Sequence, residues 1–331
     1  MNVEVVNTEW FDEGAMRLPN YRVGRVNYGN GRAYIKILGD GELEQPFRLY
    51  TSLTTAIHQA SPMAKPLLEW YCKHGYEEAK RLANIAANYG TLLHLVIGEY
   101  IINHAFDFDT VTDRVRQYCL ENKYTYPETK EWQWKLRDDM AAYIQFHHDY
   151  KVKPLAVEYV LVSDKGFGTL IDLVCKMTIE EKGFFGEVYK SGERKGEPKE
   201  SKKEREITAI INFKSGRNGF HESNGLQILC EKQLFEENFP DIKIEAAFNW
   251  APKEWKGKPS YHLKDWTGTF TNEEIDAMLI LANIRFGEKA LEREYTSFSG
   301  LAIEGRGLSE VMTFERVEDY CRRKFSSTPT V

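Results

Sequence analysis

The sequence lacks the cysteine patterns of a disulfide-rich or metal-thiolate protein. Its 331 residues include five cysteines, at positions 72, 119, 175, 230 and 321, and no two of them form a CxxC pair. An odd number of widely spaced cysteines does not suit a disulfide framework, and it offers no thiolate set for zinc or an iron–sulfur cluster. We therefore expect reduced thiols, most of them buried.

The sequence also lacks long apolar runs. No segment approaches the roughly 18 consecutive apolar residues that a membrane span needs. The first residues, MNVEVVNTEWFDEG, contain neither the basic region nor the apolar region of a secretory signal. These two absences predict a cytoplasmic protein that does not associate with a membrane.

An excess of positive charge is absent as well. The formal net charge is −6, with 42% hydrophobic and 28% charged residues, which is typical of a soluble globular enzyme. A negative net charge disfavours a protein that coats nucleic acid. It does not exclude one that cuts nucleic acid, because a cutting site needs carboxylates, and a local groove of Lys and Arg can bind phosphate.

Alternating polar and apolar residues begin the chain. They predict two strands, over 21–27 and 33–38, that are joined by a turn at Gly29-Asn30-Gly31. We therefore predict that residues 1–50 form a β-rich extension with a hairpin. No internal repeat follows it.

The rest of the chain, residues 51–331, has the pattern of one α/β domain. Gly90 is expected to interrupt the first helical segment, and Thr271 with Glu274 has the pattern of a capping box. A charged insertion over 181–206 is expected to be a solvated hairpin or loop. Periodicity predicts helices over 61–104, 131–150, 222–238, 271–290 and 309–324, and strands over 155–162, 168–177, 207–213 and 242–250. This order predicts a central mixed sheet flanked by helices.

Acidic and basic residues lie on the predicted central strands. Asp172 lies within the apolar segment GTLIDLV, where an unpaired carboxylate is costly to bury. Asn212 and Lys214, in IINFKSG, share one face of the next strand, while Phe213 points to the other face. Pairing of these strands would bring Asp172, Asn212 and Lys214 together at one edge of the sheet. The strands over 155–162 and 168–177 are predicted to form a hairpin across Asp164-Lys165-Gly166, and Glu158 on the first of them faces this hairpin.

This order of segments resembles the RecB-like branch of the PD-(D/E)xK nuclease superfamily, which includes lambda-type exonucleases and CRISPR-associated adaptation nucleases. The matching segments are YTSLTTAIHQ, GTLLHLVIGEY, VEYVL, GTLIDLV, IINFKSG and HESNGLQILCEKQLF, which span roughly residues 50–250. The resemblance implies a restriction-endonuclease-like core, with an N-terminal β-hairpin addition and C-terminal helices.

The resemblance also implies a role for each site residue. His94, Asp172, the residue at position 212 and the backbone carbonyl of Phe213 would hold Mg²⁺ or Mn²⁺. Lys214 would position or activate the attacking water. Glu158 would support a ligand or a second metal, and Gln227 would steady Lys214 or the substrate. The implied function is metal-dependent hydrolysis of DNA, as an exonuclease on linear ends in recombination, repair or phage replication, with a recombination or replication protein as a possible partner. Nothing indicates the oligomeric state.

Two positions depart from the family pattern. Asn212 stands where the family has an acid, and Glu231 stands where the QxxxY motif has tyrosine. An amide offers a metal only a neutral carbonyl oxygen. Asn212 is therefore either a deliberate Asp→Asn change that inactivates the enzyme in an otherwise intact site, or a native residue that leaves a weakened or purely binding site. The second reading leaves an alternative function, a catalytically inactive pseudo-nuclease that binds DNA or a protein.

Each site residue also has a purely structural interpretation. Asp172 could be a hairpin carboxylate that caps backbone amides, and His94 a satisfied core histidine. Lys214 could be a surface lysine at a strand end, Gln227 an exposed helical residue, and Glu158 the partner of a lysine. His147 and His148 point apart on a helix, so we expect them to be surface residues. The aromatic residues before the helix at 131–150 are expected to pack rather than stack on bases; they are Tyr124, Tyr126, Trp132 and Trp134.

Overall fold

A mixed β-sheet of ten strands lies at the centre of the structure. The structure is a computed structural model. It describes residues 3–286 except 7–9, 13, 17–18, 20, 29–30, 39–47, 62, 64 and 125–128. The strands are β1 (Val3–Val6), β2 (Trp10–Phe11), β3 (Tyr21–Tyr28), β4 (Gly31–Leu38), β5 (Tyr50–Ser52), β6 (Lys153–Val162), β7 (Phe167–Gly183), β8 (Ser201–Phe213), β9 (Ala246–Pro252) and β10 (Tyr261–Asp265). The helices are α1 (Leu53–Ala60), α2 (Lys65–His74), α3 (Tyr76–Asn103), α4 (Val111–Glu121), α6 (Trp132–Asp149), α7 (Glu222–Asn238) and α8 (Asn272–Phe286). The predicted α/β class, a mixed sheet flanked by helices, is confirmed.

The N-terminal hairpin belongs to the same sheet as the rest of the chain. β3 and β4 pair antiparallel along their full lengths, as the alternating pattern predicted, although Gly29 and Asn30 lie outside the described residues. β5 then pairs antiparallel with β4 and parallel with the start of β7. The strand order is therefore β1-β3-β4-β5-β7-β8-β9-β10, with β6 paired to β7 and β2 to β6.

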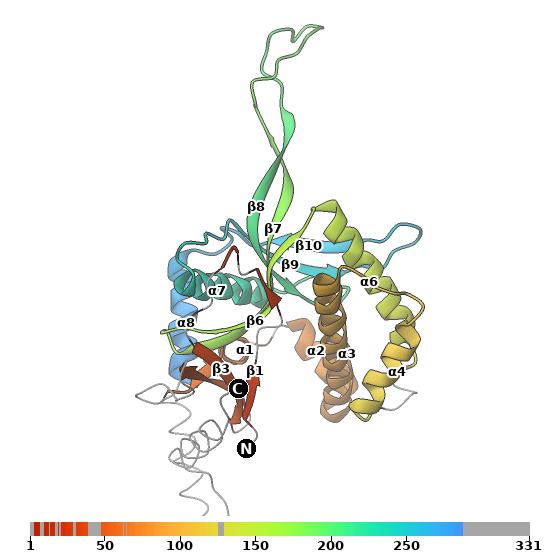
Figure 1. Ribbon diagram of the computed structural model, residues 1–331, viewed down its shortest axis with the longest axis vertical. Coiled ribbons are helices and arrows are strands. Elements are labelled where there is room, and N and C mark those ends of the chain that lie inside the picture. Colours follow the sequence, from red (N-terminus) through yellow and green to blue (C-terminus); the bar gives the residue numbers. More distant parts are fainter. Residues whose placement is uncertain are drawn as a thin grey trace, which may run out of the picture.

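Helices cover both faces of the sheet (Figure 1). On one side, α3, α4 and α6 share an apolar core with Leu173 and Cys175 of β7. On the other side, α1, α7 and α8 pack against Val174 and its neighbours. Successive β7 residues thus contribute to opposite cores, as the twofold periodicity of a strand requires. The central strands are buried on both faces, which explains their nearly continuous apolar sequence.

Helix α3 continues without a break through Gly90, so the predicted interruption there is wrong. A Cβ at Gly90 would lie 3.1 Å from the hydroxyl oxygen of Ser215, so the glycine makes room for the segment that follows β8. Within the described ranges, α3 is the one helix long and apolar enough to cross a membrane, and 39% of its most apolar window is buried. Its buried apolar residues belong to the core shared with α6, whereas Leu95 and Ile102 are exposed, and core helices of soluble proteins meet the same criterion.

The charged insertion forms a hairpin that projects from the body of the molecule (Figure 1). β7 and β8 remain paired out to Gly183 opposite Ser201. Cross-strand ion pairs of opposite sign join them, including one between Lys202 and Glu180 at 2.6 Å. The prediction of a solvated hairpin is confirmed. Its strands are extensions of the two central strands of the sheet.

Several elements differ from the predictions. α1, α4 and β10 were not predicted, and β9 begins at Ala246 rather than at 242. The capping box is confirmed, because Thr271 and Glu274 each accept a hydrogen bond from the other's backbone N–H. The four described cysteines are free thiols, three of them buried, as expected. The helix predicted over 309–324 and Cys321 lie outside the described residues.

Gly225 of α7 provides a test of this packing. A Cβ at this position would lie 2.4 Å from the Trp266 ring, whereas a Cβ at Gly98 of α3 would make only an ordinary contact at 3.8 Å. We expect Gly225→Ala to lower the free energy of unfolding by about 1–3 kcal/mol through overpacking. Gly98→Ala, the matched helical control, should raise it by about 0.5–1 kcal/mol through helix propensity. Urea unfolding measures both changes, and a stabilising Gly225→Ala substitution would contradict this packing.

Candidate metal centre

Strands β7 and β8 separate at the candidate site. Their regular pairing ends with Leu173 opposite Ile211, so Asp172 and Asn212 are the first residues beyond it. Instead of a backbone ladder bond, the Asp172 carboxylate accepts the Phe213 N–H at 2.6 Å. Asp172 is only 4% exposed. The buried Asp172 carboxylate is therefore bound to the end of β8, between the two helical layers.

Strand β6 turns at Glu158, opposite Asp172. The register passes from Val157 paired with Leu173 to Tyr159 paired with Ile171. Val157 packs into the core on the α3 side, and Tyr159 packs into the core on the α7 side, although residues two apart normally share a face. The change of face coincides with a left-handed backbone at Glu158, where φ is +48°. Such a conformation costs a non-glycine residue about 1–3 kcal/mol and is characteristic of functional sites.

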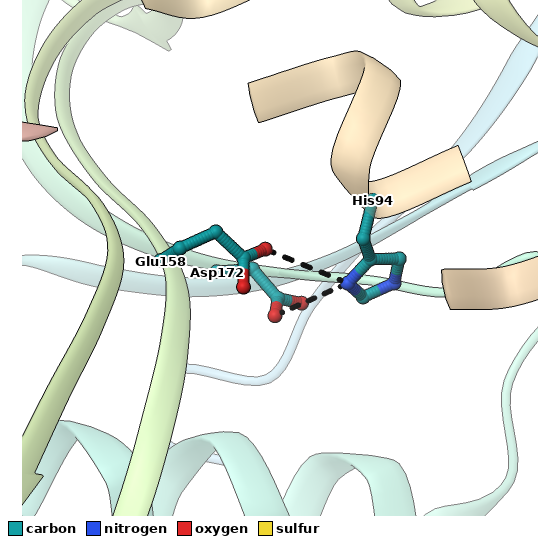
Figure 2. Close-up of side chains that lie close together, drawn as sticks. All are labelled: His94, Glu158 and Asp172. Carbon is teal, nitrogen blue, oxygen red and sulfur yellow. Dashed lines mark ion pairs between the residues drawn. The ribbon is translucent and has the colours of Figure 1, made fainter. Parts of the chain in front are cut away.

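Helix α3 brings His94 to these two carboxylates (Figure 2). The Nδ1 atom of His94 lies 3.4 Å from Oδ1 of Asp172 and 3.8 Å from Oε1 of Glu158. In the described part of the chain, these three form the only group of at least three His, Cys, Asp or Glu residues whose ligand atoms all lie within 4.8 Å of one another. His94 is therefore a partly buried histidine with acidic partners, and its role as a metal ligand stays a prediction.

The Phe213 backbone orients the His94 ring from the opposite side. The Nε2 atom of His94 lies 3.1 Å from the carbonyl oxygen of Phe213. In the neutral ring, donation from Nε2 leaves Nδ1 with a lone pair on the side of the carboxylates, which is the usual arrangement of a metal-binding histidine. Burial opposes protonation of the ring, but Asp172 and Glu158 outweigh it and raise the pKa of His94. Direct binding of the Phe213 carbonyl to a metal stays a prediction.

Lys214 and Gln227 contact each other on the α7 side. The Nζ atom of Lys214 donates a hydrogen bond to Oε1 of Gln227 at 3.2 Å. Burial lowers the pKa of Lys214, although the charges of Asp172 and Glu231 oppose this shift. Gln227 is 4% exposed, so the interpretation of Gln227 as an exposed helical residue is wrong. The lysine is held by a buried partner rather than lying free at a strand end.

Glu231 completes the polar network, and sequence reasoning gave it no role in the site. It is fully buried and accepts hydrogen bonds from the Gln227 amide at 2.8 Å, the Asn212 amide at 3.2 Å and the Thr169 hydroxyl at 3.3 Å. Burial, together with the charge of Asp172, raises the pKa of Glu231 to about 7, against the effects of Gln227, Lys214 and Asn212. The only sequence signal was the departure from QxxxY.

An ion pair fixes the segment that follows Lys214. Arg217 donates to the buried carboxylate of Asp139 on α6 at 2.5 Å, and the hydroxyl of Tyr89 on α3 donates to the same carboxylate at 2.7 Å. Burial raises the pKa of Asp139, while its hydrogen bond from Tyr89 and the charge of Arg217 oppose the shift. These contacts join the end of β8 to the helical layer that carries His94.

The two remaining predictions concern residues away from this network. His148 is exposed, but His147 is half-buried and packs against Tyr100 and Tyr143, so its prediction as a surface residue is wrong. Trp132 packs against Tyr89 and Tyr124, as expected for structural aromatics, while Trp134 is exposed and Tyr126 lies outside the described residues.

The donor set suits a hard divalent cation. Two carboxylates and one imidazole converge, and oxygen-rich sets of this kind bind Mg²⁺ and Mn²⁺. Asn212 supports the fit, because its Oδ1 atom is buried and has no hydrogen-bond partner among the residues described. An unsatisfied buried carbonyl oxygen is unfavourable by roughly 1–3 kcal/mol unless it gains a partner. A cation would provide one.

A scan against protein-family models found no family that matches the chain, and a comparison with curated proteins found no similar sequence.

Backbone strain at Glu158 can be measured by stability. We expect Glu158→Gly to be more stable than Glu158→Ala by about 1–2 kcal/mol, because glycine adopts the left-handed conformation without steric cost. Lys176 of β7 is an exposed strand control without a positive φ. There, the glycine variant should be less stable than the alanine variant. If the alanine variant is more stable than the glycine variant at position 158 as well as at position 176, the Glu158 backbone is not strained.

Thermal unfolding tests the metal centre. Mn²⁺ at about 100 times its dissociation constant should stabilise the protein by about 2.7 kcal/mol, seen as a higher unfolding temperature. The increase should vanish in His94→Ala and Asp172→Asn, because each removes a ligand. Their matched controls are His148→Ala and Asp113→Asn, whose side chains are 87% and 82% exposed, and both should keep it. An increase that persists in Asp172→Asn would place metal binding elsewhere.

Proposed function

We propose that this chain is a metal-dependent deoxyribonuclease that degrades linear DNA from its ends. The observation that carries the proposal is the convergence of His94, Glu158 and Asp172, from three separate elements, within 4.8 Å. The order of sequence segments that resembles RecB-like nucleases provides the reaction class. The mixed sheet flanked by helices is compatible with that resemblance.

The three clustered residues would bind Mg²⁺ or Mn²⁺. A divalent cation supplies charge neutralisation at the phosphate and lowers the pKa of bound water. Asp172 is held for this task by its bond from the Phe213 N–H, and His94 is held by the Phe213 carbonyl. The same peptide segment therefore orients two of the three ligands. This shared support is the kind of outer contact on which metal affinity depends.

Lys214 would act on the attacking water. Its ammonium group lies on the α7 side of the separated strands and is steadied by Gln227 at 3.2 Å. With a cation held by the three clustered residues, Lys214 would donate a hydrogen bond that orients the attacking water. Burial also disfavours its charged form, which brings the amine closer to exchanging a proton with that nucleophile. Gln227 in this scheme positions Lys214.

DNA binding without cleavage is the second candidate function. One observation favours it: position 212, on the strand next to Asp172, carries a neutral amide instead of a carboxylate. With fewer anionic ligands, a cation is held more weakly. The two candidates differ in cleavage but share a bound DNA, so a cleavage assay distinguishes them.

The decisive experiment incubates the protein with end-labelled linear duplex and with closed circular DNA, in Mg²⁺, in Mn²⁺ and in EDTA. We expect loss of the linear substrate only, and no reaction in EDTA. Asp172→Asn should reduce the rate by more than the roughly 10- to 100-fold that outer partners of metal ligands contribute. Asp113→Asn, an exposed carboxylate on α4, should leave the rate unchanged.

Other outcomes revise the proposal in defined ways. Cutting of the circular DNA would indicate an endonuclease. Salt-dependent binding of DNA, with no product under either metal, would favour the second candidate function. Neither binding nor cleavage would refute both candidates.

A further inference from the structure

The two departures from the family pattern contact each other in space. Asn212 ends β8 and Glu231 lies on α7, yet Nδ2 of Asn212 lies 3.2 Å from Oε2 of Glu231. Both side chains are buried, with exposures of 4% and 0%. Nineteen positions separate them in the sequence. An amide has replaced the expected acid, and an acid has replaced the expected tyrosine, at two positions that are neighbours.

Donor and acceptor chemistry fixes the orientation of the Asn212 amide. In the structure the NH₂ group of Asn212 faces Glu231, the orientation in which an ionised carboxylate accepts the hydrogen bond. The carbonyl end, Oδ1, then points away from Glu231; it is buried and has no partner within the described part of the chain. Asn212 is therefore held by one end and leaves a neutral oxygen available at the other.

The Glu231 carboxylate accepts three hydrogen bonds. Besides Asn212, it accepts from the Gln227 amide and the Thr169 hydroxyl, and Gln227 in turn holds Lys214. An aspartate at position 212 would remove one of these donors and set a second acceptor about 3 Å from the first. Two buried carboxylates at that distance repel each other or must take up a proton.

We propose that Asn212 is the native residue of this site and functions as a matched pair with Glu231. Glu231 orients the amide so that Oδ1 serves as a neutral ligand, and it supplies from α7 the acidic group that β8 lacks. Asn212 is then a site residue in its own right and Glu231 is a positioning residue for Asn212 and Gln227. The ligand role of Oδ1 rests on the proposed metal-dependent function, whereas the pairing itself does not.

The test exchanges the two side chains singly and together. Asn212→Asp, Glu231→Gln and the double exchange are compared with the starting protein, and Glu222→Gln, at an exposed position of α7, is the matched control. Thermal unfolding in EDTA at mildly alkaline pH gives the first readout. We expect Asn212→Asp to lower the unfolding temperature by on the order of 5–10 °C and the double exchange to recover most of that loss. The control should not change it.

Mn²⁺ affinity, measured by calorimetry, gives the second readout. Glu231→Gln should weaken binding by roughly 10- to 100-fold, as the loss of an orienting partner does, and the double exchange should restore it. If Asn212→Asp alone unfolds at the original temperature or higher and binds Mn²⁺ more tightly than the double exchange, Asn212 is an inactivating change and the proposal is wrong.

The unfolding readout needs neither metal nor DNA. A protein that shows the exchange pattern but never cuts DNA would therefore refute the proposed function and leave the pairing intact.

Discussion

The hydrogen bond from the Phe213 N–H to the Asp172 carboxylate holds the candidate site open. It replaces the backbone ladder bond that would otherwise keep β7 and β8 together, so the strands separate without leaving this amide unsatisfied. A bond to a charged acceptor is worth about 1.5–3 kcal/mol, against about 1 kcal/mol for a neutral one. The separation is thus favoured locally. It gives His94 access from one helical layer, and Gln227 and Glu231 access from the other.

Each buried acidic group has at least one partner from another element of the fold. Asp172 is satisfied by β8, Asp139 by Arg217 and Tyr89, and Glu231 by three donors. Removing one partner of a buried ionic group is costly, since the remaining charge cannot be hydrated. The network therefore makes the relative positions of α3, α6 and α7 interdependent. The hydrogen bonds of the site therefore help to hold the helices in place, and the packing of the helices holds the hydrogen-bonding groups in position.

The sequence predicted the parts of this structure that depend on local pattern. The central strands, α7 and the hairpin at 164–166 follow from periodicity, and the contact of Asp172 with the end of β8 follows from strand pairing. The left-handed backbone of Glu158 could not be predicted, because tertiary packing on two faces imposes it against intrinsic preference. The contact of Asn212 with Glu231 depends on how α7 packs on the sheet. The residues around either position do not indicate that packing. The prediction of a helix break at Gly90 was wrong because this glycine allows Ser215 to approach the helix closely and does not end it.

The projecting hairpin has a mechanical consequence. Its two strands are the same strands that carry Asp172 and Asn212, and they are continuously paired from Gly183 and Ser201 down to the point of separation (Figure 1). Two-stranded ribbons twist more strongly than strands within a wide sheet. The twist of the hairpin and the separation of β7 from β8 beside Asp172 are therefore features of one continuous pair of strands. A ligand that changed the twist of the projecting part would act on the same two strands that carry Asp172 and Asn212.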